Sequence, residues 1–493
     1  MKIVEDEDRD LIPRWRRFSK SIGETRAITP PSELETYVQV ISPELLSEWK
    51  VAPSLTLASE IVSSAYLANS RQPALGAAKM VVESTSITGL AKKLAKEILG
   101  HPIEPEAATL FEEDEWVRQV RVRTNRYPRD PIAWVDLALG YVISGKIKHA
   151  ERALKVAISL APDDRFVLRA IARFYVHQDR SDLALHILRK SLATKHDPWL
   201  IATEISVCEA LDRTSSLTKS GRTMILKSGL SPHHLSELSS EVATLEYRHG
   251  NVRNAKKLFK TSLLDPTENA VAQAGWASRR EEAFTFPVRA SATGLQSAEA
   301  LAWEAYSDSD WSGAGDFSTQ WFKDQPFSVR PALLGSCAHG IALENYDEAI
   351  KVCEKSAICN PNDVMLLNNC AYNLAMDNQL EKAERYFDRI SGEIEDKEKA
   401  ISTVLIATRG LLRIRQGSID IGISDYRHSI AIALGNRDYN RAVMAASNLA
   451  MELKSINRPE EARQTMMDTL AMEKMLDDNL SQLVFSRAKK RIL

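Results

Sequence analysis

The cysteines are the side chains of this 493-residue sequence from which metal binding or thiol chemistry would first be expected. They are Cys208, Cys337, Cys353, Cys359 and Cys370. No two of them form a CxxC pair, and none has the spacing of metal ligands. Because cysteine at a packed helix position behaves as a small apolar residue, we expect all five to be structural. An odd number of cysteines without a secretory signal predicts reduced thiols, as in a cytosol.

Motifs of catalysis and cofactor binding are also missing from the sequence. It contains no HExxH, no GxSxG, no glycine-rich phosphate loop and no kinase signature. The neighbouring pair His233 and His234 has no third ligand nearby, so we expect it to face solvent. We therefore predict no catalytic residue, no metal site and no cofactor. An enzyme with an unrecognised site in residues 1–130 is the alternative.

Three arginines are spaced so that they could bind a ligand. Arg165, Arg169 and Arg173 recur at i, i+4 and i+8, which places them on one face of a helix. Guanidinium groups pair bidentately with carboxylate and phosphate, so this row suits an acidic or phosphorylated peptide. The alternative is a solvated helix face whose arginines pair with Asp163 and Asp164.

Two further basic clusters are interpreted from their surroundings. One follows the acidic run at 112–115 and consists of Arg118, Arg121, Arg123, Arg126 and Arg129. The helix dipole favours acid first and base last, so a structural role is favoured over nucleic-acid binding. The stretch 14–18, RWRRF, mixes cations and aromatics and is interpreted as a docking peptide or a weak RNA contact. The net charge of −2 gives general nucleic-acid binding no support.

An internal repeat positions these residues. Residues 131–164 contain two helix-like apolar patterns separated by a polar break, and residues 165–198 repeat the same residue types at the same offsets. In the first copy the shared positions are Trp134, Leu137, Ala138, Tyr141, Ala150 and Leu154. A fixed period of this size is typical of a stacked helical array. We expect small residues such as Ala138 and Ala150 where two antiparallel helices touch.

The pattern resembles the tetratricopeptide repeat. The units that start at 131, 165, 330 and 364 match it best, and the matching units cover about two thirds of the chain. The resemblance implies an all-α fold, a superhelical α-solenoid of antiparallel helix-turn-helix repeats. It also implies that each repeat buries its apolar face against its neighbours.

The predicted organisation follows from this frame. Residues 1–53 form a partly disordered N-terminal arm, residues 54–130 form degenerate helical repeats or an N-terminal cap, and residues 131–269 form a first array with units from 131, 165, 201 and 236. Residues 270–294 form a helix and loop insertion, residues 295–476 form a second array with units from 295, 330, 364, 403 and 443, and residues 477–493 form a C-terminal capping helix.

The resemblance also implies where a partner binds, because the first helix of each repeat lines the concave groove in this family. Carrying over the groove positions gives Val135, Leu139, Val142, Arg165, Arg169, Arg173, His177, Leu334, Asn368 and Tyr372 as candidate partner-binding residues. No unit has the Lys and Asn pair with which related repeats grip C-terminal carboxylates of chaperones, so a co-chaperone role is not expected.

These observations predict a non-catalytic scaffold or adaptor that binds a protein or peptide, possibly an acidic one, in its groove. The alternative is a sensor or regulatory subunit that binds a peptide or a nucleic acid and controls a separate enzyme. No apolar run approaches the roughly 20 residues that span a bilayer, and the N-terminus lacks the apolar core of a signal peptide. We therefore expect a cytoplasmic protein without a membrane span.

Overall fold

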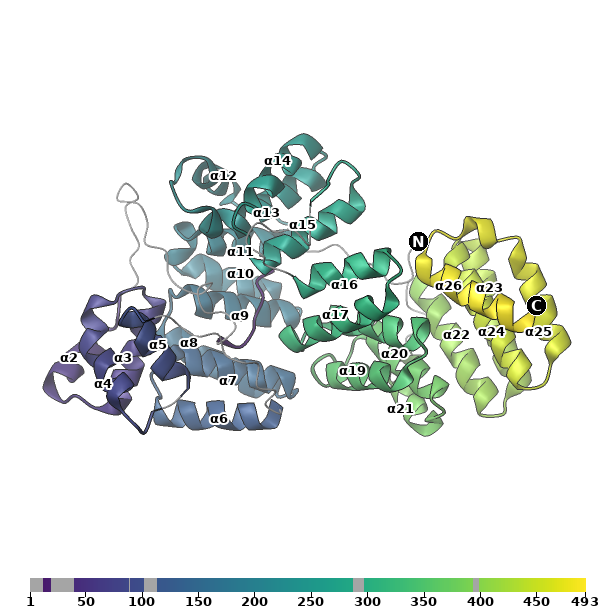
Figure 1. Ribbon diagram of the computed structural model, residues 1–493, viewed down its shortest axis with the longest axis horizontal. Coiled ribbons are helices and arrows are strands. Elements are labelled where there is room, and N and C mark those ends of the chain that lie inside the picture. The colour runs from purple at the N-terminus through teal and green to yellow at the C-terminus, as the bar shows by residue number, and fades with distance from the viewer. Residues whose placement is uncertain (1–11, 19–39, 88, 102–112, 287–296, 393–398) are drawn as a thin grey trace. The chain divides into compact units, whose positions relative to one another are not determined.

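The computed structural model describes residues 12–18, 40–87, 89–101, 113–286, 297–392 and 399–493. Within these ranges 25 α-helices follow one another, and no β-strand is present. Neighbouring helices pack as hairpins (Figure 1). The all-helical class predicted from the repeat is confirmed by these helices, and their order as successive hairpins is consistent with an α-solenoid.

Two compact units divide the chain, and each is described here by itself. The N-terminal unit comprises Asp8–Ser297. Its helices are α2 (Pro43–Val51), α3 (Leu55–Leu67), α4 (Leu75–Glu83), α5 (Leu90–Ile98), α6 (Glu113–Arg126), α7 (Pro131–Ile143), α8 (Ile147–Leu160), α9 (Arg165–His177), α10 (Ser181–Lys190), α11 (Pro198–Glu209), α12 (Thr218–Lys227), α13 (Pro232–Arg248), α14 (Val252–Ser262) and α15 (Glu268–Arg280).

The C-terminal unit comprises Ala298–Leu493 together with Met1–Glu7, which lie outside the described residues. Its helices are α16 (Ala298–Ser307), α17 (Trp311–Asp324), α18 (Val329–Ser336), the π-helix η3 (Cys337–Ala342), α19 (Tyr346–Cys359), α20 (Val364–Met376), α21 (Leu380–Ser391), α22 (Lys399–Arg415), α23 (Ile419–Gly435), α24 (Tyr439–Ser455), α25 (Pro459–Leu470) and α26 (Asn479–Ile492).

The repeat period fixes where the hairpins begin. The helices α7 and α9 start at Pro131 and Arg165, one 34-residue period apart in the sequence. Asp130 caps α7 by accepting the backbone N–H groups of Ile132 and Ala133. After α7 the chain reverses at Gly145, whose φ of +69° is in the left-handed region that glycine adopts without strain. Local sequence therefore sets both ends of this helix.

Small residues allow the two helices of a hairpin to approach closely. Ala138 on α7 and Ala150 on α8 are both fully buried, as the spacing of small residues predicts. The same role is taken in the C-terminal unit by Gly410 and Gly422, because a Cβ on Gly422 would lie 2.6 Å from the Gly410 carbonyl oxygen. The helices α22 and α23 consequently pack backbone against backbone.

Several predicted boundaries fall on helix ends, and one helix was not foreseen. The first helices of the predicted units start within six residues of the predicted numbers, from α7 at Pro131 to α24 at Tyr439. The helix α2 lies in the arm that was expected to be partly disordered, and it packs against α3. Residues 287–296 of the predicted insertion lie outside the described residues. The assignment of residues 54–130 to repeats or to a cap stays a prediction.

Candidate functional site

The first helices of successive repeats lie next to one another in each unit. In the N-terminal unit α7 contacts α9, α9 contacts α11, α11 contacts α13 and α13 contacts α15. We call the surface formed by these five helices the first-helix face of the N-terminal unit. In the C-terminal unit the corresponding contacts join α18, α20, α22 and α24. The candidate partner-binding residues all come from these first helices.

The apolar candidates of the N-terminal unit lie in its interior. Val135, Leu139 and Val142 are at most 1% exposed. Each is therefore enclosed by other parts of the chain, and none presents free surface to a partner. Their contact with a partner stays a prediction that requires part of this enclosure to open.

The arginine row is engaged inside the protein. Arg165 pairs with Asp197 at 2.6 Å, and Arg169 pairs with Glu237 at 2.8 Å. Both guanidinium groups also lie over the indole ring of Trp199, 4.9 and 4.6 Å from its centroid. These side chains are buried, so each charge is compensated where it is desolvated. Both guanidinium charges are therefore paired within the chain, and contact of these arginines with an acidic partner stays a prediction.

The remaining candidates on α9 are more accessible. Arg173 and His177 are half-buried, one and two turns beyond Arg169 along α9. Of the two aspartates at the start of this repeat, Asp164 caps α9, and Asp163 accepts the hydroxyl of Ser191.

The N-terminal residues Ile12–Phe18 occupy the first-helix face of the N-terminal unit, and we call them the N-terminal segment. Residues 12–17 have no regular secondary structure. In Figure 1 the segment is the short purple stretch beside α9 and α15. Its partners lie between positions 66 and 297 of the sequence, far along the chain from the segment itself.

Aromatic side chains hold the N-terminal segment at one end. Phe18 is fully buried and packs edge-on against Phe166 of α9 and Tyr66 of α3, at centroid distances of 4.9 and 5.8 Å. Trp15 is 2% exposed and packs edge-on against Phe174, about two turns beyond Phe166 along α9. Such edge-to-face pairs contribute about 0.5–1.5 kcal/mol each beyond the burial of apolar area.

Charged and polar groups hold the other end of the N-terminal segment. Arg14 and Arg16 both reach Glu268 at the start of α15, at 2.9 and 3.1 Å. The next residue of that helix, Asn269, donates its side-chain N–H to the carbonyl oxygen of Ile12 at 3.4 Å. Arg17 lies over the ring of Trp116 on α6, 4.2 Å from its centroid. With the aromatic contacts included, the segment is thus bound by groups from α3, α6, α9 and α15, which are distant from it in sequence.

A buried carboxylate binds the backbone of the N-terminal segment. The backbone N–H of Phe18 donates to Oδ1 of Asp136 on α7 at 3.0 Å. Burial raises the pKa of Asp136 to about 7, while the charge of Arg123 and the Phe18 N–H oppose that rise. The carboxylate therefore titrates near neutral pH in direct contact with the segment.

The candidates of the C-terminal unit are mostly buried, and one of them packs against the C-terminal helix. Leu334 is fully buried in an apolar cluster with Trp303 and with Leu480 of α26. Asn368 is 2% exposed and its Oδ1 accepts no hydrogen bond from the described residues. Tyr372 is half-buried. Only Tyr372 among these three retains a substantial exposed area.

The helix α26 does more than stack on the last repeat. It packs against α24, α25 and η3, so it also touches the first repeats of its unit. Arg487 donates to the carbonyl oxygens of Ile341 and Ala342 at the end of the π-helix, and Arg491 pairs bidentately with Glu344 at 2.9–3.0 Å. These bonds hold the pKa of Glu344 below its usual value. Cations at a helix C-terminus satisfy carbonyl groups that have no intrahelical partner.

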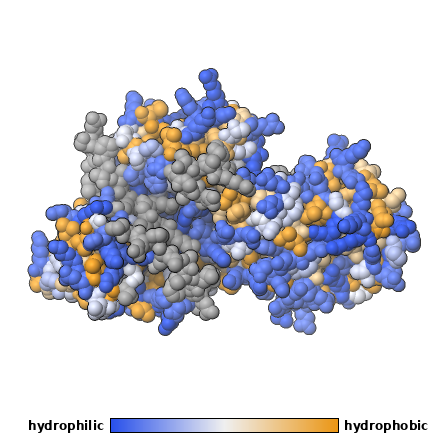
Figure 2. Space-filling model, in the orientation of Figure 1, coloured by the Kyte–Doolittle hydropathy of each residue, from blue (hydrophilic) through white to orange (hydrophobic). Residues whose placement is uncertain are grey.

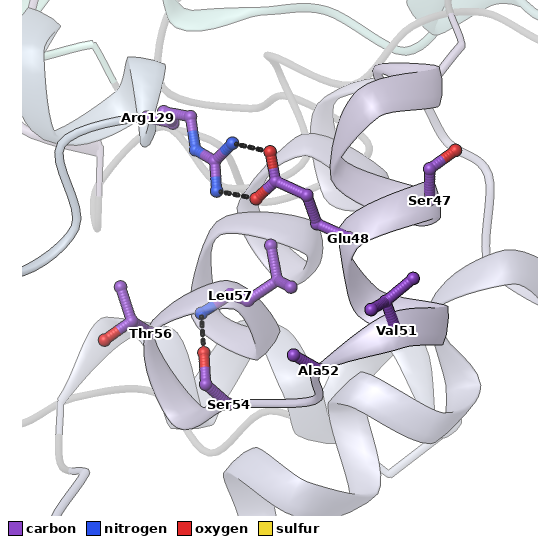
Figure 3. Close-up of a pocket in the computed structure, with 8 residues that line it drawn as sticks. All are labelled: Ser47, Glu48, Val51, Ala52, Ser54, Thr56, Leu57 and Arg129. Atoms are coloured by element: carbon purple, nitrogen blue, oxygen red, sulfur yellow. Dashed lines mark hydrogen bonds and ion pairs between the residues drawn. The ribbon is translucent and has the colours of Figure 1, made fainter.

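A pocket of about 450 Å³ lies on the N-terminal unit between α2 and α3 (Figure 3). The two charged residues that line it, Glu48 and Arg129, form a bidentate ion pair at 2.7–2.8 Å. Arg129 also reaches the buried Glu60 at 3.1 Å. The pairing holds the pKa of Glu48 below its usual value. The pocket's charged groups therefore join α2 to the start of α7 and are already compensated.

Sequence reasoning missed the carboxylates that contact the N-terminal segment and the arginine row. Asp136, Glu237 and Glu268 lie on first helices, where the repeat pattern marks cationic and apolar positions but gives carboxylates no special signal. The available signal is the mixture of arginines and aromatics at 14–18, which predicts a docking peptide or a weak RNA contact. The five cysteines are buried and form no disulfide. No group of three or more potential metal ligands occurs among the described residues.

The hydrophilic residues dominate the face of the molecule seen in Figure 2, and its hydrophobic residues lie in small separated groups. No helix within the described ranges is both long and apolar enough to cross a membrane.

Comparison with known proteins gives limited information. No family model matches the chain, and no curated protein is similar to it in sequence. Among solved structures, the crystal structure of yeast Tom70 is similar over 77% of this chain and 96% of its own length, with 11% sequence identity and a TM-score of 0.29. The assignment of the fold therefore rests on the helices of this chain.

Proposed function

We propose that this protein is a non-catalytic scaffold or adaptor of the cytosol that binds a protein partner through a linear peptide on the first-helix face of its N-terminal unit. One observation carries the proposal: this face holds the segment Ile12–Phe18 through side chains of α7, α9 and α15. Extended peptides are recognised in this way, with polar side chains on the peptide backbone and apolar surface for its side chains.

The groups on this face suit binding better than catalysis. The buried Asp136 and the carboxylate Glu268 contact a backbone N–H and two guanidinium groups, respectively. Neither is placed beside a nucleophile in the described residues, and their present ligands are peptide groups. A regulatory subunit that transmits peptide binding to a separate enzyme is the second candidate function, and it is compatible with the same face.

The test is capture of partners by the full-length tagged protein from its native host, with two matched charge reversals. Arg173→Glu changes a half-buried side chain of α9, whereas Lys155→Glu changes an exposed side chain on the second helix of the preceding hairpin. We expect a partner whose capture is unchanged in Lys155→Glu and altered in Arg173→Glu. An acidic peptide would be lost, and a basic peptide would be captured more strongly, because the face gains negative charge. Circular dichroism confirms that both variants are folded.

Unchanged capture of every partner by Arg173→Glu would move the binding site away from this face. A protein that binds nucleic acid instead would show affinity that falls steeply with salt, since binding to phosphates releases counterions.

A further inference from the structure

The N-terminal segment is attached to the helices as a ligand would be. The hydrogen bonds that join the segment to Asp136, Glu268 and Asn269 each use a side chain on at least one side. The backbone hydrogen bonds of these helices do not depend on the segment, because residues 12–17 form no regular secondary structure. The segment can therefore leave without breaking the hydrogen-bond ladder of any repeat.

The bound segment presents a definite chemical pattern. Two buried aromatic rings, Trp15 and Phe18, stand three residues apart, and Arg14 and Arg16 flank the first ring. The rings meet aromatic side chains of α9 and α3, and the two guanidinium groups share the carboxylate of Glu268. The partner groups of the face are thus aromatic at one end and acidic at the other.

We infer that Ile12–Phe18 is a resident ligand of the first-helix face, and that the partner which displaces it carries a basic and aromatic peptide of the same pattern. The inference rests on the function proposed above and specifies its ligand class and its regulation. While the segment is docked, a partner peptide binds only the small fraction of molecules from which it has dissociated. The apparent dissociation constant rises by the reciprocal of that fraction.

The probe for this inference is a fluorescently labelled peptide with the sequence of residues 10–20, DLIPRWRRFSK, and its binding is measured by fluorescence anisotropy. The receptor is the full chain, either as the parent or as the variant Trp15→Ala with Phe18→Ala. If the segment is docked in more than about 90% of parent molecules, the variant binds the peptide at least about tenfold more tightly. A peptide in which both aromatic residues are alanine serves as the negative control.

A second substitution locates the peptide on the proposed face. Glu268→Arg added to the double variant places a cation where Arg14 and Arg16 of the peptide would bind, and we expect at least about a tenfold loss of affinity, because about 1.4 kcal/mol corresponds to that factor. Reversing both arginines of the peptide to glutamate should then restore binding to the Glu268→Arg chain. A merely structural role of Glu268 would not give this reciprocal rescue.

The inference would be overturned by a folded double variant that does not bind the peptide. It would also be overturned by equal binding to the parent and the double variant, or by unchanged binding to the Glu268→Arg chain. If the double variant loses its helical circular dichroism, the variant Arg14→Glu with Arg16→Glu replaces it, and unfolding of that variant too would show that the segment is part of the fold. Preferential binding of a glutamate-rich peptide would also count against a basic ligand.

These results are separable from the test of the proposed function. A partner that is captured by the parent and lost with Arg173→Glu, together with no binding of the peptide, would leave the scaffold function intact and refute only the ligand class. Peptide binding without any captured partner would support the resident ligand and contradict the scaffold function.

Discussion

Replacement of Phe18 by alanine tests whether the N-terminal segment is a detachable ligand or part of the core. Phe18 is fully buried, as is Phe259 of α14, which packs against Phe284 and Phe286 in the same unit. Removal of a buried phenylalanine ring from a core costs about 3–5 kcal/mol of stability. We expect that loss for Phe259→Ala, because this ring has no alternative position while the unit is folded.

The loss for Phe18→Ala should be smaller, because the segment can dissociate instead of leaving a cavity. The loss cannot then exceed the free energy with which the segment docks. An occupancy of about 90–99% corresponds to about 1.4–2.7 kcal/mol, since each factor of ten is about 1.4 kcal/mol. Phe18→Ala would remove most of this docking energy, because it deletes one buried ring together with its two edge-to-face pairs.

Urea denaturation followed by circular dichroism gives the two free energies of unfolding, and hydrogen exchange identifies which helices are affected. For Phe18→Ala we expect faster exchange at α7 and α9 with little change in global unfolding. Equal destabilisation by Phe18→Ala and Phe259→Ala would refute the reasoning, because it would show that the segment unfolds only with the whole unit.

Three further predictions concern other features. Burial raises the pKa of Asp136 from 3.8 to about 7 in the folded protein, so the native state is stabilised by binding a proton below pH 4 and loses that stabilisation as pH rises through 7. Asp136→Asn should therefore be more stable than the parent above pH 7, by up to about 4 kcal/mol at about 1.4 kcal/mol per pKa unit. The difference should vanish near pH 4. Urea titrations at several pH values check this, and an unchanged pH profile would contradict it. Arg169→Ala should lower the free energy of unfolding by about 3–5 kcal/mol, because it leaves Glu237 buried without its cation. Arg169→Met combined with Glu237→Leu should lower it much less, and equal losses in thermal denaturation would contradict the role of the pair. On α23, Gly422→Ala should destabilise the C-terminal unit by more than about 1 kcal/mol, because the new Cβ would meet backbone atoms of α22. Gly435→Ala on the same helix should be neutral or stabilising, because nothing lies near that site. Similar melting temperatures for the two variants would refute the close crossing of α22 and α23.

Local chemistry explains why the helical hairpins could be predicted. The alanines Ala138 and Ala150 recur at the hairpin contact, aspartates such as Asp130 and Asp164 precede first helices, and Gly145 follows one. Each of these features acts over fewer than 15 residues, a distance over which the sequence pattern alone is informative. The predicted hairpins therefore begin and end close to the observed residues.

The candidate site could be predicted only in part, because position in a repeat says which way a side chain faces and does not say what covers it. The row of Arg165 and Arg169 was expected to lie on one helix face, and it does. Its partners are Asp197 and Glu237, which belong to later repeats and approach only when the helices stack. The π-helix at 337–342 was also not foreseen, since one additional residue in a helical turn leaves no clear signal in the apolar pattern.

Both units have their first helices covered by an end of the chain, but the two coverings differ physically. The helix α26 carries its own backbone hydrogen bonds and buries Leu480 and Phe485 in two apolar clusters, so its removal would expose a large apolar surface. The N-terminal segment buries two rings and is otherwise bound by single ion pairs and hydrogen bonds, each of which is worth about 1 kcal/mol. Exchange with a partner peptide is therefore far less costly on the N-terminal unit. For the same reason a partner reaches the residues around Phe166 more readily than Leu334, which lies beneath α26.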